Sequence, residues 1–226
     1  MLQKTDLRRI IGAIYHIIVL GIFITITVVG YKYIYPGQSF NIMNLLVLFK
    51  YITFITMTMI QVYFVNSTLL LMCKQYTVHS YFYVLSFTYA WTILVMYFIV
   101  LIVDHTVATE NPELKNMPLW FNHTCHIIPA VVTLLEAFIC RPKSVSLWKS
   151  FVVCYILMTV YNIYMEVSIV ALQFSPYPKL DKIPTVYRYL VYLISWGLVT
   201  IFTLVSYGIL RFIRRNDNDI RELKME

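Results

Sequence analysis

Six stretches of this chain are each long enough and apolar enough to cross a lipid bilayer as a helix. A bilayer core of about 30 Å needs about 20 helical residues. Four of the stretches contain no Asp, Glu, Lys or Arg, and the other two contain one Glu each. None alternates apolar and polar residues as the strands of a membrane barrel do. The sequence therefore predicts one all-α membrane domain over residues 1–226, with six transmembrane helices at Ile10–Val29, Tyr51–Cys73, Tyr81–Val103, Pro118–Cys140, Phe151–Phe174 and Tyr189–Leu210.

The composition supports this prediction and excludes other classes of protein. Apolar residues make up 60% of the 226 residues and charged residues only 13%, about half the roughly 25% of a soluble domain. These values exclude a disordered chain, a coiled coil and a typical water-soluble enzyme. The four cysteines show no paired spacing. Their pattern therefore predicts neither a disulfide framework nor a cysteine-based zinc site.

The distribution of basic residues predicts the orientation of the six spans. An even number of spans leaves both termini on one side of the membrane, together with the loops after spans 2 and 4. This side carries 12 of the 18 Lys and Arg residues, and the other side carries 6. Cytoplasmic segments are enriched in Lys and Arg, so we expect both termini in the cytoplasm. The same flanks account for the net charge of +7 without a nucleic-acid partner.

Several polar side chains lie within the predicted spans, where they are costly and commonly functional. Helix direction sorts them by depth. Span 2 enters from the outer side just before Thr53, and span 4 enters from the same side just before His126. Span 5 runs the opposite way, which brings its later residues into the outer half as well. We therefore expect the outer half of the domain to contain Thr53, His126, Asn162 and Glu166.

A hydroxyl and an imidazole at matched depth can perform nucleophilic acyl transfer. The imidazole removes the hydroxyl proton while the oxygen attacks a carbonyl carbon. A third group must orient the base, and Glu166 or Asn162 could supply it. Backbone N–H groups in mid-helix are already bonded, so we expect side chains such as Asn122, Asn162 or a tyrosine to stabilise the oxyanion. Glu136 lies ten residues after His126, roughly 15 Å along a helix, and is not an obvious partner of that imidazole.

Simpler interpretations compete with this one. A helical Thr commonly donates to the carbonyl four residues earlier, and a membrane His commonly bonds a neighbouring helix. His16 is expected near the cytoplasmic face in a structural role. His123 and His126 share a helix face and could hold a metal, although only two ligands are in view. The alternative function is a transporter, a lipid-binding protein or a regulatory scaffold, in which the buried Glu and His residues line an ion path.

Short motifs in spans 1, 2 and 4 resemble one family of membrane proteins. In span 1, the segment Ile14-Tyr-His16-Ile-Ile-Val-Leu resembles the first helix of one branch of this family. The segment Lys50-Tyr-Ile-Thr53-Phe resembles the K-[FY]-[LM]-T-[FL] entry to the second helix of androgen-induced protein and androgen-dependent TFPI-regulating protein. The segment Leu119-Trp-Phe-Asn122-His-Thr-Cys-His126 resembles their W-L-N-H-x-M-H segment. Glu136 falls where the family has a Glu, whereas Thr56 stands where the family usually has Asp or Asn. The six-span layout also agrees.

The resemblance implies a multipass hydrolase of fatty acid esters of hydroxy fatty acids. It assigns the nucleophile to Thr53 and the base to His126, the same pair that depth selects. Lys50 lies three residues before Thr53 on the same helix face and could bind the free carboxylate of such an ester. The reaction needs no metal or organic cofactor. The expected partners are the lipid ester and membrane lipids, in the plasma membrane or an internal membrane.

Overall fold

The computed structural model describes residues 4–73, 76–103, 116–143, 145–171, 177 and 182–222. Within these residues the chain forms α-helices and one 3₁₀ turn, and no strand. The elements are α1 (Lys4–Ile34), α2 (Ile42–Val47), η1 (Leu48–Lys50), α3 (Ile52–Met72), α4 (Tyr76–Val103), α6 (Leu119–Cys140), α7 (Leu147–Val170) and α9 (Thr185–Glu222).

All six predicted spans are confirmed as helices that are long and apolar enough to cross a membrane. The observed helix bounds differ most from the predicted ones in the first and last spans. Helix α1 begins at Lys4 and α9 continues to Glu222, because a helix satisfies its own backbone groups in water as well as in lipid. Helix α7 ends at Val170, and residues 172–174 of the predicted fifth span lie outside the described residues.

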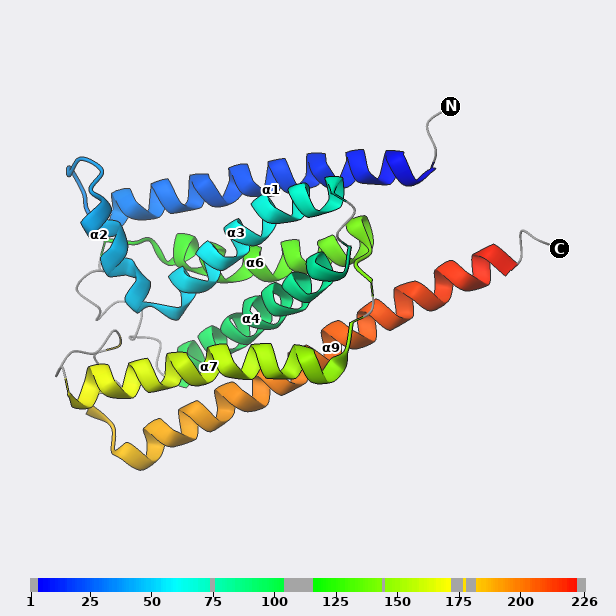
Figure 1. Cartoon of the computed structure of the whole chain (residues 1–226). Coiled ribbons are helices and arrows are strands. Elements are labelled where there is room, and N and C mark those ends of the chain that lie inside the picture. Colours follow the sequence, from blue (N-terminus) through cyan, green and yellow to red (C-terminus); the bar gives the residue numbers. More distant parts are fainter. Residues whose placement is uncertain are drawn as a thin grey trace.

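Helix α4 lies at the centre of the bundle and packs against α3, α6, α7 and α9 (Figure 1). Helix α1 covers α3 and α6 on one side, and α7 pairs with α9 on the other. Helix α1 begins and α9 ends at the same end of the bundle (Figure 1). This arrangement agrees with an even number of spans. Which side of the membrane this end faces stays a prediction from the Lys and Arg count.

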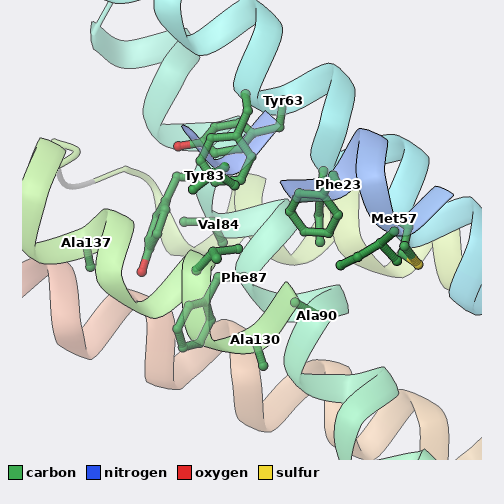
Figure 2. Packing of buried hydrophobic residues seen from close by; sticks show 14 of the residues in the cluster. Phe23, Met57, Tyr63, Tyr83, Val84, Phe87, Ala90, Ala130 and Ala137 are labelled. Atoms are coloured by element: carbon green, nitrogen blue, oxygen red, sulfur yellow. The ribbon is translucent and has the colours of Figure 1, made fainter. Parts of the chain in front are cut away.

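The core is built from aromatic and small residues contributed by different helices. Figure 2 shows Phe23 of α1, Tyr63 of α3 and Phe87 of α4 filling the space between helices, with Ala90 and Ala130 nearby. Small residues let helix backbones approach closely, which is how helices associate in lipid. Outward faces instead carry exposed Ile, Val, Leu and Phe side chains along every span. An apolar outer face is what contact with lipid tails requires.

Candidate active site at the start of helix α3

Thr53 and His126 are in direct hydrogen-bond contact. The Thr53 Oγ1 atom lies 3.1 Å from the His126 Nε2 atom, within the range expected for a nucleophile and its base. Thr53 comes from α3 and His126 from α6, and the two residues are 73 positions apart in the sequence. The structure thus brings together the two residues that helix depth and the family motifs had selected.

The position of Thr53 in the first turn of α3 gives it polar surroundings that a mid-helix residue lacks. The chain reaches α3 through α2 and η1, two short elements that the sequence analysis did not predict. Helix α3 begins at Ile52, and its first helical hydrogen bond runs from the Ile55 N–H to the Tyr51 carbonyl. The N–H groups of Thr53 and Phe54 have no hydrogen-bond partner among the described residues. They form the positive end of the helix dipole.

Tyr161 of α7 fixes this helix start. Its hydroxyl accepts a hydrogen bond from the Ile52 N–H at 3.1 Å and donates one to the Lys50 carbonyl at 3.3 Å. One side chain therefore holds both the last residue of η1 and the first residue of α3. The bond satisfies a backbone donor that would otherwise be unpaired and sets the position of Thr53 one residue later.

The ring of His126 is held in the tautomer that a base requires. Its Nδ1 atom lies 2.8 Å from the carbonyl oxygen of Asn122, one turn earlier in α6. A carbonyl can only accept, so Nδ1 carries the proton and Nε2 presents a lone pair to the Thr53 hydroxyl. The group that orients the base is therefore a backbone carbonyl, whereas the sequence analysis had considered the Glu166 and Asn162 side chains.

Comparison with other helical threonines separates Thr53 from the common structural role. Five other threonines donate their hydroxyl to the carbonyl four residues earlier, at distances of 2.9–3.2 Å. These residues are Thr25, Thr68, Thr124, Thr133 and Thr200. Thr53 contacts an imidazole on another helix instead. The simpler interpretation of Thr53 as a back-bonded helical residue does not describe this site.

Tyr97 of α4 forms one wall of the site. Its ring stacks on the His126 imidazole with a centroid distance of 3.8 Å and an interplanar angle of 11°. The Tyr97 hydroxyl lies 2.7 Å from the His123 Nδ1 atom. His123 and His126 therefore contact different partners, and both nitrogens of His126 already have partners. This geometry does not favour the metal pair that their spacing had suggested.

A small cavity adjoins the Thr53 hydroxyl. The volume of this cavity is about 10 Å³, close to the minimum that one water molecule requires. Pro129 in its wall lacks the N–H that would bond the Cys125 carbonyl, so the helix ladder of α6 is interrupted beside the cavity. The lining residues are Thr53, Thr56, Met57, Ala90, Ile93, Cys125, His126 and Pro129.

Thr56 supplies a polar group to the cavity wall. Its hydroxyl is buried and has no hydrogen-bond partner among the described residues. A buried hydroxyl without a partner costs about 1–3 kcal/mol, so its presence beside Thr53 calls for an explanation. In the sequence, Thr56 stands out only because the family usually has Asp or Asn at this position.

The remaining predicted site residues make other contacts. Lys50 is buried, and its ammonium lies 5.1 Å from the centroid of the Tyr51 ring. The prediction that Lys50 and Thr53 share one helix face is wrong, because Lys50 ends η1 and the extended Tyr51 separates it from α3. The Asn162 amide lies 3.4 Å from the Ser195 hydroxyl of α9. Glu166 accepts from Arg188 at 3.1 Å and from the Tyr192 hydroxyl at 3.0 Å. Asn162 and Glu166 thus join α7 to α9, and the structure does not bring either of them into contact with His126.

A family model matches residues 11–213, which include every residue of the site, four of the membrane helices in full and most of α1 and α9. Its description is FAR-17a/AIG1-like protein. The chain belongs to the FAR-17a/AIG1-like family. This result confirms the family that the motifs around Thr53 and His126 resemble. Searches of curated proteins and of solved structures returned no significant match.

Proposed function

We propose that this protein is an intramembrane hydrolase that cleaves fatty acid esters of hydroxy fatty acids, with Thr53 as nucleophile and His126 as base. The observation that carries the proposal is the 3.1 Å contact between the Thr53 hydroxyl and the His126 Nε2 atom. Membership of the FAR-17a/AIG1-like family and six membrane-like helices are consistent with a lipid substrate.

Acylation begins with transfer of the Thr53 hydroxyl proton to His126 Nε2 while Oγ1 attacks the ester carbonyl carbon. The resulting imidazolium donates its Nδ1–H to the Asn122 carbonyl, which stabilises the positive charge. When the tetrahedral intermediate collapses, His126 returns the proton to the leaving alkoxide. The hydroxy fatty acid leaves, and the acyl chain remains as an ester on Thr53.

Deacylation repeats the steps with water as the nucleophile. His126 removes a proton from the water molecule, the hydroxide attacks the acyl carbonyl, and His126 then protonates Thr53 as it leaves. The cavity beside Thr53 has space for about one water. The cycle releases the fatty acid and restores both residues, so each turnover consumes one ester and one water molecule.

The oxyanion of both intermediates needs hydrogen-bond donors close to Thr53. The Thr56 hydroxyl lines the same cavity and has no other partner among the described residues, so we assign it this role. The unpaired N–H groups at the start of α3 add the positive end of the helix dipole. Side-chain donors from Asn122 or Asn162, which the sequence favoured, are not needed in this scheme.

Turnover of a fatty acid ester of a hydroxy fatty acid by the purified chain in proteoliposomes tests the proposal. Thr53→Ala and His126→Gln should each lower kcat by at least about 100-fold, the lower range for loss of a positioned acid–base group. Thr25→Ala, which removes a hydroxyl that only bonds the Gly21 carbonyl, is the matched control and should keep full activity. Equal turnover by Thr53→Ala and the control would contradict the proposal.

A further inference from the structure

A second polar cluster lies within the helix bundle and takes no part in the proposed hydrolysis. His16 of α1, His79 of α4 and Glu136 of α6 converge there, each with no more than 1% of its side chain exposed. Their ligand atoms all lie within 4.8 Å of one another. Glu136 lies ten residues after His126 in the same helix, roughly 15 Å along its axis. The cluster is therefore separate from the Thr53 site.

The hydrogen bonds around His16 leave one contact unexplained. The Thr68 hydroxyl donates to the Phe64 carbonyl at 3.2 Å, so at its 3.2 Å contact with His16 Nδ1 it accepts and the imidazole donates. In the neutral ring, Nε2 then carries a lone pair. This atom lies 2.9 and 3.0 Å from the two carboxylate oxygens of Glu136. His16 Nε2 and the two Glu136 oxygens would then be three acceptors in contact. Such a contact is stable only if a cation lies between them or if the imidazole is protonated.

The distances between these atoms are similar to the distances between neighbouring ligand atoms around a bound metal ion. Ligand atoms about 2.0–2.2 Å from a tetrahedral zinc ion are about 3.3 Å from one another. His16 Nε2 and His79 Nε2 lie 2.9 and 3.2 Å from Glu136 Oε1. The Cys140 Sγ atom lies 3.4 Å from His16 Nε2, but it is not one of the atoms that all lie within 4.8 Å of one another, so it contacts the cluster only from beside His16. Imidazole, carboxylate and thiolate are the ligands that zinc prefers.

The surrounding groups orient the ligands as they do in metal sites. His16 donates its other ring nitrogen to Thr68, and the Tyr63 hydroxyl donates to Glu136 at 2.8 Å. Bonds of this kind fix the tautomer of a ligating imidazole and the position of a ligating carboxylate. The Glu136 carboxylate offsets one of the two charges of a divalent ion, and direct bonds to the ligands replace the water that the buried ion has lost.

We propose that His16, His79 and Glu136 bind a zinc ion that joins α1, α4 and α6. The three ligands are buried and none of them lines the cavity beside Thr53, so we assign the ion a structural role. It is independent of the proposed hydrolysis, since neither Thr53 nor His126 is a ligand. Because the ligands come from three helices far apart in the sequence, zinc binding should stabilise their packing.

Metal analysis of the full-length chain, purified in detergent after expression with added zinc, tests this site. Inductively coupled plasma mass spectrometry should find about one zinc per chain in the wild type. Glu136→Gln and His79→Asn should retain less than about a tenth of this zinc. His126→Gln, a substitution on the same helix outside the cluster, should retain all of it. A wild-type chain that carries no zinc, or zinc that survives in Glu136→Gln, would overturn the proposal.

A thermal unfolding measurement keeps the test valid if a cluster variant fails to fold. A zinc chelator should lower the Tm of the wild-type chain, and added Zn²⁺ should restore it while Mg²⁺ should not. An unchanged Tm in both steps would show that Glu136 and His16 form only a charged hydrogen-bonded pair. Hydrolysis of the lipid ester is not measured in either experiment, so failure of the zinc site leaves the proposed function untouched.

Discussion

The ring of Tyr97 lies parallel to the imidazole of His126, with their centroids 3.8 Å apart. This stacking holds the plane of the base while the Asn122 carbonyl holds its tautomer. Tyr97 comes from α4, the central helix of the bundle, so the packing of the core directly sets the orientation of the imidazole.

Substitutions at Tyr97 should separate stacking from hydrogen bonding. Tyr97→Phe keeps the ring and removes only the hydroxyl that contacts His123, so we expect kcat within about 3-fold of wild type. Tyr97→Ala removes the ring and lets the imidazole rotate, so we expect kcat to fall about 10–100-fold. The measurement is turnover of the lipid ester at saturating substrate. Equal losses in the two variants would show that the hydroxyl, rather than the stacked ring, positions His126.

Removal of the Thr56 hydroxyl should change activity and stability in opposite directions. Thr56→Val keeps the shape of the side chain and removes an unpaired buried hydroxyl, so the Tm should stay the same or rise. The kcat should fall about 100–1,000-fold, as for loss of one oxyanion donor, and Thr56→Ser should recover much of it.

Thr92 offers a matched control for this prediction. Its hydroxyl is also buried without a partner among the described residues, but it does not line the cavity. Thr92→Val should therefore leave kcat unchanged. If Thr56→Val behaves like Thr92→Val, the assignment of Thr56 to the oxyanion is wrong.

Lys50 should determine the preference for substrates that carry a free carboxylate. Lys50 is buried at the end of η1, three residues before Thr53 in the sequence, and a buried cation attracts an anion strongly. Lys50→Met should raise KM for the free-acid substrate by about 10-fold or more and should change KM little for its methyl ester. A similar rise in KM for both substrates would mean that Lys50 supports the helix start and does not recognise the carboxylate.

The Glu166–Arg188 ion pair should contribute to stability rather than to catalysis. The two side chains join α7 to α9 at 3.1 Å and are largely shielded from solvent. Glu166→Gln and Arg188→Gln should each lower the Tm, because each leaves a partly buried charge without its partner. A double-mutant cycle should give a coupling energy of about 1 kcal/mol or more. A large loss of kcat in folded Glu166→Gln would instead support the role that the sequence had suggested for this residue.

The six spans and the Thr53–His126 contact could be predicted from the sequence for a simple reason. Apolar length determines which segments cross a bilayer, and the direction of each span then determines the depth of its residues. Thr53 and His126 each lie shortly after the start of a span that enters from the same side. The similar depth of Thr53 and His126 in the membrane therefore followed from counting residues from the start of each span.

Contacts that depend on helix rotation and neighbour order could not be predicted in the same way. Depth placed Glu166 and Asn162 near His126, but α7 packs against α9 and their side chains bond that helix. Tyr97 and Thr56 gave no signal, because an aromatic ring and a hydroxyl are common in any span. His79 was missed because it lies just before the predicted third span, although the start of α4 and the end of α6, which carry His79 and Glu136, lie at the same end of the bundle.

The measurement that tests the central claim most directly is the identification of the residue that a fluorophosphonate probe modifies. The wild-type chain should be labelled in membranes, and mass spectrometry of the digested protein should place the phosphonate on Thr53. His126→Gln should keep the fold and lose the label, because the Thr53 hydroxyl then has no base. A label on any other residue, or undiminished labelling of Thr53→Ala at equal expression, would contradict Thr53 as the nucleophile.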